Sequence, residues 1–248
     1  GYAVSNMVAG DVTGDGRADL VVSALQQSTA VPPGPSVARI LLIRGNPAGG
    51  FLAPTFLAPI AATTSSPLIE LTDATGDGKP DVVYVERPTN NLYLLKGNGT
   101  GGFTSTGAPI AVSGPAGLAA GDLNRDGRGD IIVMTSATVG TLLANPAEAD
   151  GFQPMTQFGV DLSGVSGVSL ADANQDGFTD LLASGTRAGV GAGLMLRGQG
   201  RGAFDPTAVP LTLGQTPLIA RRQAVRDGEG YVDPIAVRNV RRNVSGSS

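Results

Sequence analysis

The chain contains no cysteine, no histidine and no tryptophan among its 248 residues. Without cysteine and histidine it can form no disulfide, no thiol or imidazole catalyst and no Cys/His zinc site. Any bound metal ion must therefore be held by oxygen atoms, which favours a hard cation. Aromatic residues make up only 4% of the chain, so few rings are available to stack against sugars or nucleic-acid bases.

Long hydrophobic runs are also absent, and we expect no membrane insertion. Glycine and proline are abundant instead, with 37 and 17 residues, which favours a chain with many turns. Short runs rich in valine, isoleucine and leucine alternate with these turns, as in DVVYVE and DIIVM. Such runs predict short β-strands, and no segment shows a sustained helical period.

One loop pattern occurs four times. Each copy has aspartate at loop positions 1, 5 and 9, threonine or asparagine at position 3 and glycine at position 6, followed by an aliphatic run. The copies begin at Asp11, Asp73, Asp122 and Asp172. A fifth, eroded copy contains Asp227, Glu229 and Asp233, with Val225 in place of the first aspartate.

These copies divide the chain into five repeat units, at about 1–59, 60–110, 111–160, 161–212 and 213–248. Four short strands in a unit of about 50 residues are typical of a β-propeller blade. We therefore predict one all-β domain, residues 1–248, folded as a β-propeller of about five four-stranded blades. The fifth unit ends soon after its second strand, so its blade is expected to be incomplete, or completed by another segment or subunit.

The loop, together with the glycine-rich turn and phenylalanine that follow it (GNGTGGF in the second unit), resembles the FG-GAP/VCBS repeat family. That family includes the calcium-loop propeller of integrin α-subunits. The resemblance covers nearly the whole chain, and it implies an extracellular, cell-surface or periplasmic propeller with calcium in its blade loops. It does not imply one biochemical activity, because propellers of this kind serve many functions.

The loop spacing itself fits calcium, because oxygen ligands at alternate residues can surround one ion, as in the EF-hand. Position 7 is expected to contribute only its backbone carbonyl, because its side chain varies from unit to unit. We expect about four Ca²⁺ ions, one per intact loop. The predicted ligands are Asp11, Thr13, Asp15, Arg17 and Asp19; Asp73, Thr75, Asp77, Lys79 and Asp81; Asp122, Asn124, Asp126, Arg128 and Asp130; and Asp172, Asn174, Asp176, Phe178 and Asp180.

An alternative is that these loops are turns in which aspartate side chains hydrogen-bond their own backbone. The charge distribution favours the ion, because twelve of the 21 acidic residues lie in the four loops and clustered carboxylates repel one another without a cation. The third loop also spells Arg128-Gly129-Asp130, the tripeptide that integrins bind. Asp130 is expected to be a loop ligand, so we interpret this tripeptide as a coincidence.

The expected function is that of a calcium-stabilised binding or scaffold module for adhesion or assembly, with a protein or cell-surface partner. No nucleophile–base pair is evident, so we predict no catalytic residues and no enzyme activity of its own. Six arginines lie among the last 28 residues, but with few aromatic residues between them we expect no nucleic-acid partner. The alternatives are a lectin, or the accessory or catalytic propeller of a calcium-dependent enzyme acting on polysaccharide or lipid.

Overall fold

Four antiparallel sheets make up the computed structural model, which describes residues 1–27, 36–58, 60, 65–145, 147, 151–207 and 209–211. Each sheet has four strands in chain order, and no helix occurs among the described residues. Every strand hydrogen-bonds to the next along the chain, so each sheet is a simple meander. We call the sheets blades 1 to 4.

Blade boundaries follow the repeat units closely. Blade 1 comprises β1 (Tyr2–Gly10), β2 (Asp19–Gln26), β3 (Val37–Ile43) and β4 (Thr55–Ala58). Blade 2 comprises β5 (Leu68–Thr72), β6 (Asp81–Glu86), β7 (Asn91–Gly97) and β8 (Phe103–Ala111). Blade 3 comprises β9 (Gly117–Gly121), β10 (Asp130–Met134), β11 (Thr138–Leu142) and β12 (Thr156–Gly159). Blade 4 comprises β13 (Ser163–Ala171), β14 (Asp180–Arg187), β15 (Val190–Leu196) and β16 (Val209–Leu211).

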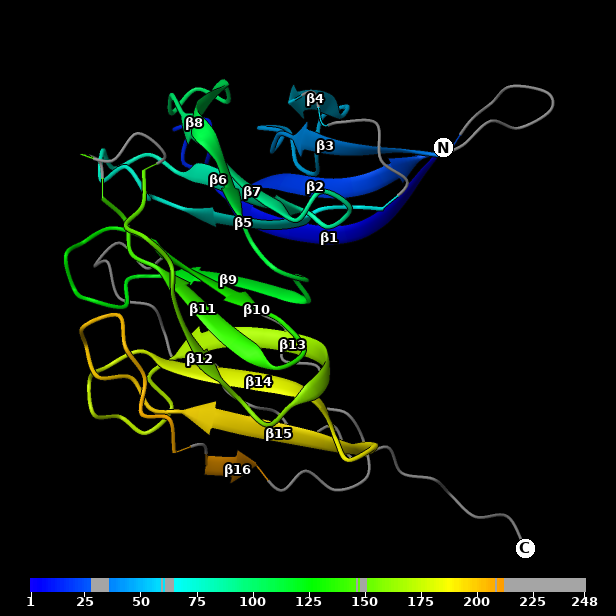
Figure 1. Cartoon of the computed structure of the whole chain (residues 1–248). Coiled ribbons are helices and arrows are strands. Elements are labelled where there is room, and N and C mark those ends of the chain that lie inside the picture. Colours follow the sequence, from blue (N-terminus) through cyan, green and yellow to red (C-terminus); the bar gives the residue numbers. More distant parts are fainter. Residues whose placement is uncertain are drawn as a thin grey trace, which may run out of the picture.

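The blades stack face to face in sequence order, with their first strands β1, β5, β9 and β13 next to one another (Figure 1). Strands β6 and β10 are buried along their whole length because a blade covers each of their two faces. Alternate residues therefore belong to different cores: Val82 packs in the core between blades 1 and 2, and Val83 in the core between blades 2 and 3. This double burial explains why both strands are continuous apolar runs.

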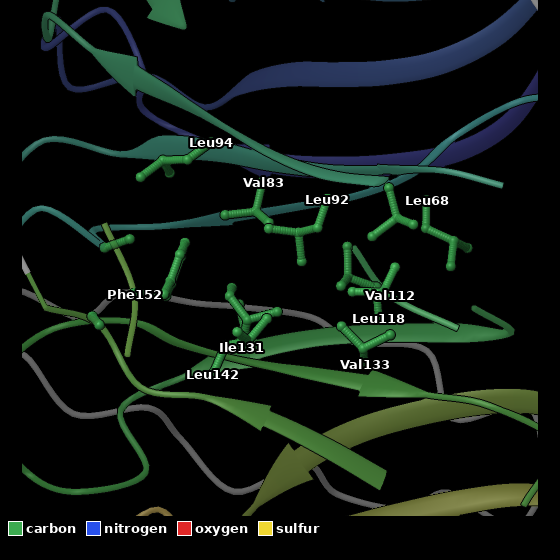
Figure 2. Close-up of a cluster of buried hydrophobic side chains, with 14 residues drawn as sticks. Leu68, Val83, Leu92, Leu94, Val112, Leu118, Ile131, Val133, Leu142 and Phe152 are labelled. Atoms are coloured by element: carbon green, nitrogen blue, oxygen red, sulfur yellow. The ribbon is translucent and has the colours of Figure 1, made fainter. Parts of the chain in front are cut away.

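A recurring phenylalanine packs between each pair of neighbouring blades. Phe103 lies against the core between blades 1 and 2, Phe152 in that between blades 2 and 3, and Phe204 in that between blades 3 and 4. Figure 2 shows Phe152 among side chains from blades 2 and 3, including Leu94 and Ile131. Phe51 of blade 1 occupies the equivalent position but is 53% exposed, because no blade precedes blade 1 in the described structure.

The prediction of an all-β propeller with four-stranded blades is confirmed, but the number of blades is four in the described structure rather than about five. The fifth unit, residues 213–248, lies outside the described residues, as do Asp227, Glu229 and Asp233. The described part of the chain contains no helix long and apolar enough to cross a membrane.

Candidate metal centre in the aspartate loops

The four aspartate loops connect the first strand of each blade to the second, as the repeat pattern predicts. Each loop turns sharply, because the glycine at position 6 has a φ of 79° to 84° in all four copies. Such a positive φ is strained for residues with a side chain, which explains why glycine occupies this position every time.

The first aspartate of each loop accepts hydrogen bonds from the backbone of the same loop. Oδ1 of Asp11 accepts the N–H of Gly14 at 2.7 Å and that of Asp15 at 3.2 Å, while Oδ2 accepts the N–H of Gly16 at 2.8 Å. Asp73, Asp122 and Asp172 make corresponding bonds. Burial alone would raise the pKa of Asp11, but these N–H donors hold its pKa below the ordinary value.

The ninth aspartate lies beneath the loop and is fully buried in all four blades. In blade 3, Oδ2 of Asp130 accepts the N–H of Leu123 and Oδ1 accepts the N–H of Ala144, both at 2.8 Å. This carboxylate therefore ties the loop to the end of the third strand. Burial, together with the negative charges of Asp126 and Asp122, raises the pKa of Asp130 to about 6.

Equivalent bonds occur in the other blades, where Asp19 binds the N–H groups of Val12, Thr13 and Gly45. Asp81 binds those of Thr75 and Gly97. Burial raises the pKa of Asp81 as well, although these two donors oppose the rise.

In blades 3 and 4 the side chains at positions 3 and 5 lie together on the exposed side of the loop. The amide of Asn124 donates to Oδ2 of Asp126 at 3.0 Å, and in blade 4 Asn174 donates to Asp176 at 2.8 Å. In blade 1 the hydroxyl of Thr13 lies 3.5 Å from Oδ1 of Asp11. The structure therefore brings positions 3 and 5 together in blades 3 and 4 and positions 1 and 3 in blade 1, and it buries position 9 in every blade.

Basic side chains neutralise part of this charge in two loops. Asp15 pairs with Arg17 at 2.7 Å, and Asp77 lies 3.2 Å from Lys96 and 3.9 Å from Lys79. Burial would raise the pKa of Asp77, but the N–H of Lys79 and the ammonium group of Lys96 lower it overall. The side chains at position 7 of loops 1 and 2, Arg17 and Lys79, thus pair with the aspartate at position 5.

The donor chemistry of the loops fits a hard cation, because every predicted ligand offers an oxygen atom. Carboxylates also keep free lone pairs after accepting two or three N–H groups. In loop 2 the hydroxyl of Thr75, a predicted ligand, is buried and makes no hydrogen bond of good geometry, although it lies close enough to Asp81 to lower the pKa of that carboxyl. Within the described residues, however, no three acidic side chains converge as a ready-made metal cluster. An ion would therefore draw the side chains at positions 1, 3 and 5 closer together.

The loops also join each blade to the next. The carbonyl of Val12, at position 2 of loop 1, accepts the N–H of Gly101 in blade 2 at 2.9 Å. Leu123, at the same position of loop 3, accepts the N–H of Gly202 in blade 4 at 3.1 Å. The carbonyl of Asp73 accepts the N–H of Gly129 at 2.8 Å, so loops 2 and 3 are bonded directly to each other.

Side chains reinforce these joints between loops. The guanidinium of Arg125 in loop 3 lies over the ring of Phe178 in loop 4, 4.3 Å from its centroid, in cation–π geometry. The hydroxyl of Thr179 donates to the carbonyl of Asp122 at 3.2 Å. Loops 2, 3 and 4 are therefore linked to one another, and loop 1 is linked to the glycine-rich turn of blade 2. We call the four loops together with these joints the loop belt.

Comparison with known proteins identifies the repeat. A family model described as an FG-GAP-like repeat matches residues 11–84 and again residues 73–133, which contain the first three loops. The chain is an FG-GAP repeat propeller. Blade 4 has the same loop, strand order and packing phenylalanine as the matched blades. No curated protein sequence matches the propeller significantly.

Two solved structures are similar to the propeller. One is an Agrocybe aegerita lectin described as recognising non-reducing terminal N-acetylglucosamine, with a TM-score of 0.50, 18% sequence identity and 84% of this chain covered. The other is the V. cholerae biofilm matrix protein Bap1, with a TM-score of 0.39, 16% identity and 82% of this chain covered. The chain spans 65% of the lectin chain and 39% of the Bap1 chain. The likeness to the lectin supports the fold.

The Arg128-Gly129-Asp130 tripeptide is part of the loop belt of the propeller. Asp130 is 0% exposed and both of its carboxylate oxygens accept backbone N–H groups. Gly129 donates its N–H to Asp73 of blade 2. An integrin-type receptor needs an accessible carboxylate, so the folded propeller does not present this tripeptide as an adhesive motif.

Sequence reasoning missed the small residue at or just beyond the end of the third strand of each blade. Gly45, Gly97, Ala144 and Gly198 donate their N–H groups to the ninth aspartates at 2.8–2.9 Å. A Cβ atom at Gly97 or Gly198 would collide with the carbonyl oxygen at loop position 8. The recurring pair of a small residue and asparagine or glutamine after the third strand was the available signal.

Proposed function

We propose that the chain is a non-enzymatic binding and scaffold propeller of an extracellular, cell-surface or periplasmic assembly, in which calcium stiffens the blade loops. The observation that carries this proposal is the loop belt, since the loops proposed to hold calcium also bond neighbouring blades to each other. Fixing one loop therefore fixes the joint between two blades. A rigid stack of blades is what a module that positions protein or cell-surface partners needs.

Each of the four loops would hold one ion. The side chains at positions 1, 3 and 5, the carbonyl at position 7 and the carboxylate at position 9 would supply the oxygen atoms. Calcium would neutralise the negative charge of the loop aspartates. In the structure only backbone N–H groups and a few basic side chains offset that charge. An extracellular location would suit such loops, because extracellular modules bind calcium at about 10⁻⁴–10⁻³ M, concentrations that are not reached in the cytosol.

Thermal unfolding of the full chain tests the role of calcium. The melting temperature is measured in excess EDTA, in millimolar calcium and in millimolar magnesium. Binding to the folded state alone adds about 2.7 kcal/mol per site at a hundredfold excess over Kd, so four sites would give a large, calcium-specific rise. Equal melting temperatures in all three buffers would mean that the loops are hydrogen-bonded turns without an ion.

Hydrolysis assays on a panel of polysaccharides and phospholipids, each with calcium or with EDTA, test the non-enzymatic part of the proposal. The chain has no histidine or cysteine, and its loop carboxylates are already occupied by backbone donors or basic side chains. We therefore expect no turnover of any substrate. Turnover that disappears on substitution of a residue outside the loops would instead support the catalytic alternative.

A further inference from the structure

Position 8 of the aspartate loops links neighbouring loops to each other. In loop 3 this position is Gly129, whose N–H donates to the backbone carbonyl of Asp73 in loop 2 at 2.8 Å. In loop 4 it is Thr179, whose hydroxyl donates to the backbone carbonyl of Asp122 in loop 3 at 3.2 Å. Each link therefore joins the residue between predicted ligands 7 and 9 of one loop to the first predicted ligand of the preceding loop.

A side-chain contact accompanies each of these links and again joins equivalent positions. Arg128, at position 7 of loop 3, covers Gly76 at position 4 of loop 2, because a Cβ atom built at Gly76 would lie 2.6 Å from Nε of Arg128. Phe178, at position 7 of loop 4, is covered by the guanidinium of Arg125 at position 4 of loop 3. In both pairs, position 4 of one loop thus packs against position 7 of the next.

Loop 1 has neither contact with loop 2, although both loops lie wholly within the described residues. Position 8 of loop 2 is Pro80, and proline has no N–H to donate to the carbonyl of Asp11. Position 4 of loop 1 is Gly14, which faces the carbonyl of Gly99 in the glycine-rich turn of blade 2. Lys79, at position 7 of loop 2, also lies against Gly99. The turn therefore separates loop 1 from loop 2, whereas loops 2, 3 and 4 are bonded directly.

We propose, on the basis of the calcium role proposed above, that loops 2, 3 and 4 bind calcium as one cooperative unit, whereas loop 1 binds its ion independently. Ordering of loop 3 fixes positions 7 and 9 and hence Gly129 between them, which holds the first aspartate of loop 2 in place. The next binding event then loses less conformational entropy, which raises its affinity. By reciprocity, ordering of loop 2 or loop 4 favours binding in loop 3 to the same extent.

Such a unit would give the scaffold a threshold response to calcium. Blades 2, 3 and 4 would stiffen together over a narrow range of calcium concentration, because cooperative sites fill more steeply than independent ones. The joint between blades 1 and 2 involves loop 1, through the bond from Gly101 to Val12, and would stiffen gradually. Calcium would therefore control blade 1 separately from the other three blades.

Hydrogen-exchange mass spectrometry of the full chain across a calcium titration tests the proposal, because peptides from each loop report binding at that loop. The midpoint of a loop is the calcium concentration at which half of its amide protection has developed. Asp126→Asn removes the carboxylate at position 5 of loop 3, and Asp15→Asn removes the equivalent one of loop 1. The two variants change the charge of the loop belt by the same amount, so each is the electrostatic control for the other.

Asp126→Asn should raise the midpoints of loops 2 and 4 at least about fivefold, the lower end of typical coupling between sites, and should leave loop 1 unchanged. Asp15→Asn should raise the midpoint of loop 1 alone. The double variant Arg125→Gly/Thr179→Val keeps every predicted ligand but removes both contacts between loops 3 and 4. In that background Asp126→Asn should still shift loop 2 but no longer loop 4.

The double variant also decides the matter if Asp126→Asn does not fold, as judged by circular dichroism in excess calcium. Loop 4 should then lose the steep calcium dependence that it shares with loops 2 and 3 in the wild-type chain. An unchanged, steep transition of loop 4 in the double variant would contradict the coupling.

The outcomes separate the cooperative unit from the calcium role on which it rests. Calcium-dependent protection in which Asp126→Asn shifts loop 3 alone would overturn the cooperative unit and leave the calcium role intact. A shift of loop 1 as large as that of loops 2 and 4 would overturn the independence of loop 1. Absence of calcium-dependent protection in every loop would overturn the calcium role itself, and the cooperative unit with it.

Discussion

The backbone N–H of Gly202 donates a hydrogen bond to the carbonyl of Leu123 at 3.1 Å, and these two residues belong to different blades. Leu123 lies inside an aspartate loop, directly after Asp122. The same relation links Gly101 to Val12. The loops therefore bond neighbouring blades to each other as well as connecting strands within a blade. A substitution in one loop should destabilise both its own blade and the next one.

The first aspartate of a loop should be important even without metal. Asp122→Ala removes the acceptor of three backbone N–H groups, which are donated by Arg125, Asp126 and Gly127 at 2.6–3.2 Å. We expect a loss of about 2 kcal/mol of unfolding free energy in EDTA, since hydrogen bonds to a charged group contribute about 1.5–3 kcal/mol. Urea denaturation measures the loss. Asp161→Ala, which breaks only an exposed ion pair with Arg187, is the control and should change little.

The ninth aspartate should tolerate substitution least. Asp130→Ala would leave the N–H groups of Leu123 and Ala144 buried and unpaired, and each such group costs about 1–3 kcal/mol. Asp130→Asn keeps one carbonyl oxygen and should lose roughly half as much. Denaturant unfolding in EDTA compares the two variants. Equal losses would show that the charge of Asp130, rather than its two acceptor oxygens, is what the fold needs.

The folded chain should not support adhesion through the Arg128-Gly129-Asp130 tripeptide. Cells that express integrins specific for this tripeptide should attach to the immobilised propeller no better than to an Arg128→Ala variant, because Asp130 is buried. A synthetic linear peptide of residues 121–130 serves as the positive control, since its aspartate is free. Attachment that is lost on the Arg128→Ala substitution would contradict the structure of this loop.

The equivalent phenylalanines Phe152 and Phe51 should respond very differently to truncation. Phe152 is 2% exposed in the core between blades 2 and 3, whereas Phe51 is 53% exposed. Phe152→Ala should therefore cost about 3–5 kcal/mol and Phe51→Ala about 1 kcal/mol or less. Urea denaturation at a concentration where the chain is monomeric checks this difference. A large loss for Phe51→Ala under those conditions would mean that its ring is packed in solution.

Much of this fold could be predicted because its signals are local. The repeated aspartate spacing located four loops between first and second strands, and the apolar runs located the buried strands. The number of described blades could not be predicted, because the eroded fifth copy gives no sign of whether it packs. The burial of Asp130 was also out of reach, since its partner Ala144 lies fourteen residues away at the end of another strand.

The sequence motif alone also does not distinguish the exposed Phe51 from the buried Phe152. Both follow a glycine-containing turn and both form an isolated bridge to the residue after the third strand. Their environments differ because blade 3 has a preceding blade in the stack, whereas blade 1 has none within the described part of the chain. The same motif thus predicts the position of a side chain in its blade but not what covers it.

Phe103, Phe152 and Phe204 each pack against the preceding blade. A backbone carbonyl in the aspartate loop of that preceding blade accepts an N–H group from the following blade. Blades 2 and 3 therefore each carry both halves of this contact, a phenylalanine toward the preceding blade and a loop carbonyl toward the next one. A tandem duplication of one unit would insert a blade whose connectors already match those of its neighbours, and deletion of one unit would leave the remaining connectors compatible. The architecture can in this way gain or lose length during evolution without a new interface having to arise.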